Sequence, residues 1–195
     1  MRVAVLGASG GTGRRLVRAA LSRGLPVVEI ARSLPPPAVH ADVHDPESIK
    51  RAVEGCDVLL SGLGIVKDSP PGTLTAGARA AVASGVPRVI WLGAFGTGRS
   101  APHASGLTRA VLGAALRREL TDKIEADEVV LAAGGTVFHA GRLTDGPLAA
   151  FRSVAVKDAP HRVFPAGISR ATVAAAMIEE AVHSNFPGRI AVPLE

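Results

Sequence analysis

Tyrosine is absent from the 195-residue sequence, tryptophan and cysteine occur once each, and aromatic residues make up only 3% of the chain. Because Cys56 is the single cysteine, no internal disulfide can form, and this agrees with a reducing compartment. No apolar run is long enough to cross a bilayer, and an apolar segment already begins at Val3, which leaves no room for a signal peptide. We therefore expect a cytoplasmic protein that does not bind a membrane.

Basic residues exceed acidic residues and give a formal net charge of +5, but they are scattered and form no basic run. With so few aromatic side chains between them, this pattern does not indicate a nucleic-acid partner. The six histidines show no metal-ligand spacing, so we expect no metal site. A chain of 195 residues that is 47% hydrophobic favours one domain, spanning 1–195, with a sizeable core.

The most informative motif follows the first apolar segment. Residues 3–6 are typical of a buried parallel strand, and apolar residues recur at helical spacing from Leu16. In the turn between them, glycines allow the backbone to approach a pyrophosphate, and the helix N-terminus supplies amide donors. The alternative is an ordinary glycine-rich turn between a strand and a helix. The residues predicted to bind a dinucleotide here are Gly7, Ser9, Gly10, Gly11, Thr12 and Gly13.

A second strand is predicted over 26–31, and it ends at Arg32 and Ser33. In dinucleotide-binding folds this position selects the cofactor, because a carboxylate accepts from the ribose hydroxyl of NAD whereas an arginine favours the 2′-phosphate of NADP. Arg32 and Ser33 therefore predict NADP(H), and the alternative is an exposed arginine without a partner.

Strands and helices alternate along the rest of the chain. This order predicts an α/β fold, namely a single Rossmann-like, doubly wound parallel sheet with helices on both faces. A small substrate lobe is expected from parts of 97–106 and 141–167. Further strands are predicted at 39–43, 57–64, 88–92, 136–139 and 189–194. Further helices are predicted over 72–84 and 107–133, and two more are predicted to start at Asp45 and Ser169.

The predicted helix over 107–133 is long for a globular protein, and a break near 121–122 would divide it. Apolar residues recur every fourth position and predict one buried face, which could belong to the core or to a dimer interface. We therefore expect a monomer or a homodimer. The residues of this face are Leu112, Leu116, Leu120 and Ile124.

Five motifs together resemble those of atypical short-chain dehydrogenases/reductases, in the NAD(P)H-binding, NmrA-like group that includes flavin and biliverdin reductases. They lie at 7–13, 31–33, 41–45, 141–147 and 168–174. The resemblance implies that NADP(H) binds with its pyrophosphate at the glycine loop and its 2′-phosphate at Arg32 and Ser33. It further implies adenine beside Asp42 and Val43, and ribose and nicotinamide beside Leu63, Gly64 and the end of the fifth strand.

The catalytic residues of the wider family are largely missing. Alignment with the resembling family puts Gly93 and Ala94 where it has serine, and Glu119 where it has the tyrosine of Tyr-x-x-x-Lys. Only the lysine is kept, as Lys123. Since the sequence has no tyrosine at all, carbonyl reduction by a tyrosine acid is not expected. Hydride transfer to a conjugated acceptor remains, because such an acceptor can take its proton from water.

Three groups could still supply a proton. His139 ends the sixth strand and titrates in the useful range, although a backbone carbonyl could simply satisfy it. Glu119 and Lys123 are spaced as a helix-surface ion pair, which is the alternative to catalysis. His103 lies in the polar segment over the predicted site, where an ordinary surface loop explains it equally.

The substrate pocket is predicted around the end of the fifth strand. Its residues are Trp91, Gly93, Ala94, Phe95 and His103. The leading hypothesis is an NADPH-dependent oxidoreductase that transfers hydride to a small conjugated acceptor such as a flavin or quinone. Two alternatives remain, namely a non-redox tailoring enzyme of isomerase or dehydratase type and a non-catalytic NADP(H)-sensing protein.

Overall fold

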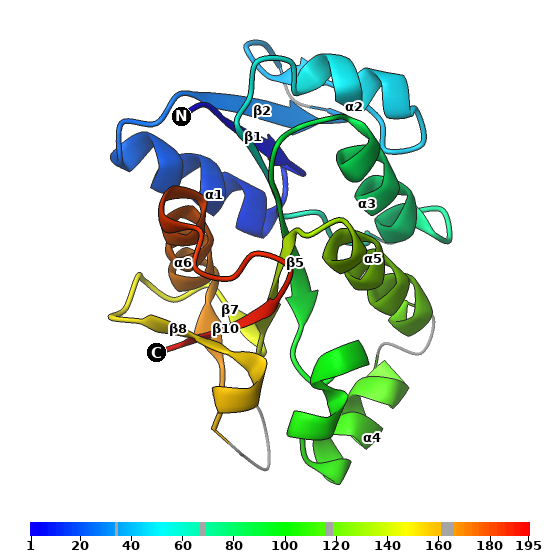
Figure 1. Cartoon of the computed structure of the whole chain (residues 1–195), viewed down its shortest axis with the longest axis vertical. Coiled ribbons are helices and arrows are strands. Elements are labelled where there is room, and N and C mark those ends of the chain that lie inside the picture. Colours follow the sequence, from blue (N-terminus) through cyan, green and yellow to red (C-terminus); the bar gives the residue numbers. More distant parts are fainter. Residues whose placement is uncertain (34, 67–68, 116–118, 161–165) are drawn as a thin grey trace.

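The computed structural model describes residues 1–33, 35–66, 69–115, 119–160 and 166–195 (Figure 1). Within these residues, eight strands form one sheet in the order β3-β2-β1-β4-β5-β6-β10-β8. All neighbours run parallel except β10 and β8, which are antiparallel. The strands are β1 (Val3–Leu6), β2 (Val27–Ala31), β3 (Val39–His40), β4 (Val58–Ser61), β5 (Val89–Ala94), β6 (Thr136–Ala140), β8 (Arg152–Ala155) and β10 (Ile190–Leu194).

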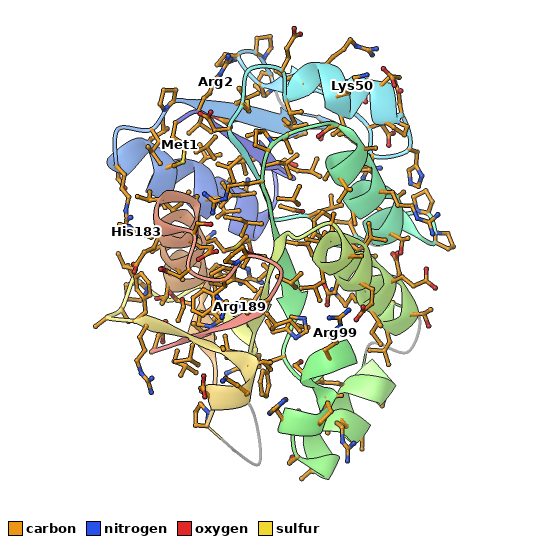
Figure 2. All side chains as sticks on the ribbon, in the orientation of Figure 1. Met1, Arg2, Lys50, Arg99, His183 and Arg189 are labelled. Atoms are coloured by element: carbon orange, nitrogen blue, oxygen red, sulfur yellow. The ribbon has the colours of Figure 1, made fainter. Side chains whose placement is uncertain are left out.

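Helices cover both faces of the sheet, as predicted. In Figure 1, α1 and α6 lie to the left of the sheet, and α3 and α5 lie to the right. Side chains fill the space between these layers (Figure 2). Leu59 and Trp91 pack in the core beneath α2, α3 and α5, whereas Leu60, Ile90 and Phe138 pack beneath α1 and α6. The helices are α1 (Gly11–Ser22), α2 (Pro46–Ala52), α3 (Thr73–Ala83), α4 (Gly106–Ala115), α5 (Leu120–Ala132) and α6 (Arg170–His183).

The strand predicted at 39–43 is shorter than expected. β3 ends at His40, because the backbone then turns around Asp42. The Asp42 amide donates to Ser48 Oγ at 3.0 Å, and the Asp42 carboxylate accepts from the His44 amide at 2.9 Å. The adjoining helix α2 starts as predicted, with Asp45 accepting from the Ser48 amide and Pro46 in the first turn.

The helical stretch predicted over 107–133 is divided, as its length indicated, but before the expected position near 121–122. Two helices, α4 and α5, replace it, and α5 begins at Leu120, before the predicted break. The Asp122 carboxylate fixes this start, because it accepts from the Leu74 amide at 3.0 Å and the Thr75 amide at 2.8 Å in the first turn of α3. The predicted apolar face is consequently not continuous. Leu112, Leu120 and Ile124 are each half-buried, and Leu116 falls outside the described residues.

The segment after β6 contains more regular structure than the sequence indicated. β7 (Leu143–Thr144) pairs in parallel with β9 (Ile168–Ser169), apart from the main sheet. β8 forms the antiparallel edge beside β10 and leads into the 3₁₀ helix η2 (Val156–Asp158). A second 3₁₀ helix, η1 (Gly98–His103), follows β5. A substrate lobe formed by these parts of the chain stays a prediction.

Candidate cofactor cleft and active site

A cleft of about 590 Å³ opens at the carboxyl ends of β1, β4 and β5. β1 lies between β2 and β4, so the strand order changes direction here, and this is where open α/β sheets bind ligands. All predicted cofactor residues line the cleft except Gly13 and Asp42. They are Gly7, Ser9, Gly10, Gly11, Thr12, Arg32, Ser33, Val43, Leu63 and Gly64.

The glycine loop brings the backbone of β1, α1 and β4 into close contact. Gly7 has a φ of 76°, in the region that favours glycine, and its amide donates to Ile30 O at 3.0 Å. A Cβ on Gly13 would lie 2.0 Å from Gly7 O, so α1 can approach the loop only with glycine there. Gly13 thus allows the close packing of α1 against the loop without lining the cleft itself.

The first turn of α1 can receive an anion. Gly10 precedes the helix, and no side chain caps the free amides of this turn. An uncapped helix N-terminus presents unpaired N–H groups and the positive end of the helix dipole. Because Gly10, Gly11 and Thr12 all line the cleft, these donors fit a pyrophosphate.

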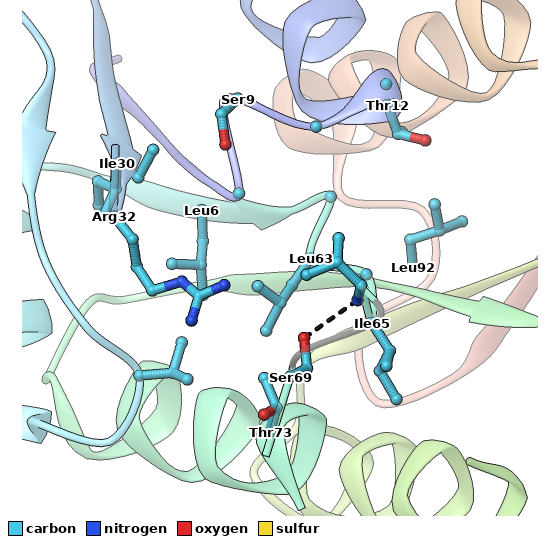
Figure 3. A pocket seen from close by; sticks show the side chains of 18 of the residues that line it. Leu6, Ser9, Thr12, Ile30, Arg32, Leu63, Ile65, Ser69, Thr73 and Leu92 are labelled. Carbon is cyan, nitrogen blue, oxygen red and sulfur yellow. Dashed lines mark hydrogen bonds between the residues drawn. The ribbon is translucent and has the colours of Figure 1, made fainter. Parts of the chain in front are cut away.

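Arg32 lies at the end of β2, where the sequence predicts the cofactor-selecting residue. Figure 3 shows its side chain extending into the cleft. No ion-pair partner of Arg32 occurs among the described residues, so its charge is available to an anionic ligand. Ser33 also lines the cleft, whereas the Asp42 carboxylate is used in the turn that ends β3.

The predicted catalytic and substrate residues are dispersed. Gly93, Ala94 and Lys123 line the cleft. Trp91 is buried in the core, and Phe95 lines a separate small cavity with β10. The remaining predicted residues, His103, Glu119 and His139, do not line the cleft.

His139 is buried and bonded to side chains instead of a backbone carbonyl. Its Nδ1 lies 2.6 Å from Ser100 Oγ in η1, and its Nε2 lies 3.0 Å from Asp127 Oδ2 in α5. Both partners are buried. A Cβ on Gly93 would lie 2.8 Å from the two Asp127 oxygens and from His139 Cδ2. The pair therefore lies directly behind the cleft wall at Gly93.

The geometry of the loop, the helix N-terminus and Arg32 is that of a nicotinamide dinucleotide site, and a comparison of sequences agrees. The sequence model of the NAD(P)H-binding family matches residues 7–184. The chain belongs to this family. No curated protein matches the chain.

Solved structures share the fold of this NAD(P)H-binding protein over its whole length. A proposed exported protein of Burkholderia pseudomallei is 26% identical, with a TM-score of 0.84 and 100% of both chains covered. SP1627 of Streptococcus pneumoniae TIGR4, a proposed NADH-flavin reductase, is 18% identical, with a TM-score of 0.83 and coverage of 100% and 99%. ChuY of Escherichia coli O157:H7, an anaerobillin reductase, is 21% identical, with a TM-score of 0.80 and coverage of 100% and 97%.

Sequence reasoning missed two arginines beside the start of α1, of which Arg170 lines the cleft. Arg170 opens α6 and lines the cleft, with its Nε 3.2 Å from the position of a Cβ on Gly11. Arg15 donates to Gly11 O at 2.9 Å. Asp145 Oδ1 pairs with both, at 3.0 Å to Arg15 and 3.1 Å to Arg170. The signal was available, since Arg170 stands in one of the five recognised motifs, but no spacing rule connects it to Gly11.

Neither a metal site nor a membrane-spanning helix is found in the described part of the chain. No three His, Cys, Asp or Glu side chains there are grouped to hold a metal ion. Every helix described is too short or too polar to span a bilayer.

Proposed function

We propose that the protein is an NADPH-dependent oxidoreductase that transfers hydride to a small conjugated acceptor. One observation carries the proposal: a single cleft joins the glycine loop, the uncapped start of α1 and Arg32 to the end of β5 at Gly93 and Ala94. When bound there, NADPH supplies a hydride. Two of the structural neighbours are described as reductases, which supports this reaction class.

NADPH is favoured over NADH because of Arg32 and Ser33. A guanidinium and a hydroxyl at the end of β2 can together bind the 2′-phosphate, whereas NADH offers only a hydroxyl there. Arg170 and the first turn of α1 would hold the pyrophosphate, and Leu63 and Gly64 would contact the cofactor further along the cleft.

The acceptor follows from the composition of the cleft near β5. Leu92, Gly93 and Ala94 carry no hydroxyl that could donate to a carbonyl oxygen. A flavin, quinone or similar conjugated molecule needs chiefly a correct distance and angle to the nicotinamide. Lys123 contributes a positive charge to the same cleft, whereas Glu119 does not line it.

The test is the anaerobic oxidation of NADPH by riboflavin and by menadione, measured as the loss of NADPH absorbance. We expect saturable turnover with at least one acceptor and a clear preference for NADPH over NADH. Tight binding of NADPH without oxidation by either acceptor would overturn the proposal in favour of a nucleotide-sensing protein. Conversion of a substrate without any net change of oxidation state would favour a tailoring enzyme.

A further inference from the structure

A buried polar chain crosses the fold behind the cleft, and the proposed function does not yet use it. It runs from Ser100 through His139 to Asp127, over the two contacts of 2.6 and 3.0 Å described above. The exposed fractions of the His139 and Asp127 side chains are 1% and 5%. A buried polar group is costly unless it has a hydrogen-bond partner, so the contacts of these three side chains limit where their protons can lie.

The contacts of Ser100 Oγ bear on whether His139 Nδ1 carries a proton. Its Oγ accepts from the Gly96 amide at 2.8 Å and lies 2.9 Å from Thr97 O, which can only accept. The one hydroxyl proton must therefore point to Thr97 O if that contact is a hydrogen bond. The remaining contact, with His139 Nδ1, is then a hydrogen bond only if Nδ1 carries a proton and donates it to Oγ. In that case His139 is protonated at Nδ1. In the opposite tautomer Ser100 Oγ donates to Nδ1, and Thr97 O keeps the Ser100 amide as its donor at 3.0 Å.

The second proton follows from the first. The 3.0 Å contact between His139 Nε2 and Asp127 Oδ2 also needs a proton, in addition to the one on Nδ1. The pair is then an imidazolium with a carboxylate, or a neutral imidazole with a carboxylic acid. Either way its net charge is zero, which burial favours over a lone carboxylate. With Nδ1 protonated, the pair holds one proton that it can release.

The Asp127 end of this buried series of side chains lies next to the cleft. Asp127 Oδ1 is buried and has no hydrogen-bond partner among the described residues. The carboxyl group occupies the space that a side chain at Gly93 would fill, and Gly93 itself lines the cleft. Lys123 stands one helical turn before Asp127 on the same face of α5 and lines the cleft as well. An unsatisfied oxygen in this position points to a ligand or a transferred proton.

We propose that the Asp127–His139 pair donates the proton that the acceptor takes up during reduction, and that Ser100 is a positioning residue that fixes the imidazole tautomer. This inference rests on the proposed function. The acceptor gains two electrons and one hydrogen nucleus as hydride from the reduced nicotinamide, and one proton from the pair. The pair is left as a carboxylate and a neutral imidazole protonated at Nδ1, and it recovers its proton from solvent.

The first test needs neither cofactor nor turnover. Isotope-edited NMR of the imidazole nitrogens of the unliganded protein should show a proton on Nδ1 of His139. The variant Ser100→Ala removes the acceptor of this proton and should leave the imidazole protonated at Nε2 alone. An unprotonated Nδ1 in the unaltered protein would overturn the deduced arrangement and, with it, the donor role.

The second test separates proton donation from structural support. Menadione takes up a hydride and a proton, whereas the N-methylacridinium ion takes up a hydride alone. We expect Asp127→Asn to slow NADPH oxidation about 100-fold with menadione, the scale of general acid catalysis, and to leave the rate with N-methylacridinium unchanged. Glu125→Gln, an exposed carboxylate on the same helix, should alter neither rate.

Equal slowing with both acceptors, or no slowing with menadione, would overturn the inference while leaving the proposed function intact. No oxidation by either acceptor in the unaltered protein would overturn the proposed function and the donor role together. Should Asp127→Asn not yield folded protein, Ser100→Ala provides the same comparison, because it keeps both members of the pair. Its rate loss should be smaller and confined to menadione.

Discussion

Arg32 extends from β2 into the cleft without an ion-pair partner among the described residues. A guanidinium held in this way keeps its full charge for an incoming phosphate. Apart from Ser33 beside it, the groups proposed to hold the cofactor are the glycine loop, the first turn of α1 and Arg170, which serve NADPH and NADH equally. Preference between the two cofactors should therefore depend on this residue more than on any other.

Replacing Arg32 with alanine tests this point. We expect Arg32→Ala to weaken NADPH binding by about 10- to 100-fold, because a hydrogen bond to a charged group contributes about 1.5–3 kcal/mol. NADH binding should change little. Calorimetric titration of both cofactors measures the effect, with Arg23→Ala, an exposed arginine at the end of α1, as the control. An equal loss for NADPH and NADH would contradict the assignment.

Cys56 offers a second prediction at this scale. Burial raises the pKa of its thiol, opposed by the charge of Arg2 and reinforced by that of Asp57. The reactive thiolate is therefore scarce at neutral pH. We expect iodoacetamide to alkylate Cys56 much more slowly in the folded protein than in urea, as followed by mass spectrometry. Equal rates would contradict the burial.

Local signals predicted some site residues and missed others for a physical reason. The glycine loop and Arg32 could be found because spacing along one strand, turn and helix determines their positions. Arg170 and Asp127 could not, because tertiary packing alone places Arg170, from the last helix, in the cleft and Asp127, from α5, behind Gly93. No periodicity in the sequence encodes such an approach.

At the scale of elements, Asp122 joins α5 to α3. Its carboxylate accepts from two amides at the start of α3 and from Thr75 Oγ1 at 2.7 Å. We expect Asp122→Ala to lower the free energy of unfolding in urea by about 2–4 kcal/mol, since it leaves these buried donors unpaired. Glu125→Ala, on the exposed side of α5, should change it by less than about 0.5 kcal/mol. Similar values for both variants would contradict the role of Asp122.

The contact between α1 and the glycine loop gives a further prediction. Gly13→Ala would bring a methyl group against Gly7 O, deep in backbone that cannot move aside. We expect a large drop in melting temperature and loss of NADPH binding. Gly113→Ala is the matched control, because nothing lies within 4 Å of its Cβ position in α4, and there alanine should stabilise the helix. A tolerated Gly13→Ala would contradict the close packing.

The errors in the predicted elements have the same origin as the missed residues. The apolar spacing from Leu112 to Ile124 continues from α4 into α5, so periodicity gave no sign of the division, and only the length of the stretch predicted one near 121–122. The break follows from Asp122, whose partners lie in α3, far away in sequence. β7 and β9 are two residues each and are defined by their pairing, which no local pattern shows.

For the whole molecule, alternation of strands and helices was sufficient to predict a doubly wound sheet with helices on both faces. The antiparallel edge strand β8 is an addition that this rule does not foresee. The family and the position of the cleft follow from the same order of elements, whereas the reaction does not. In the proposed site it depends on what binds beside Gly93 and Ala94.

The central claim is that the cleft holds NADPH in one orientation for hydride transfer. Single-turnover oxidation under anaerobic conditions, with NADPH deuterated on one or the other face of the nicotinamide, tests it most directly. We predict that bound NADPH is oxidised when menadione or riboflavin is added, and that deuterium slows the reaction on one face only. The absence of oxidation, or equal rates for both deuterated forms, would contradict the account.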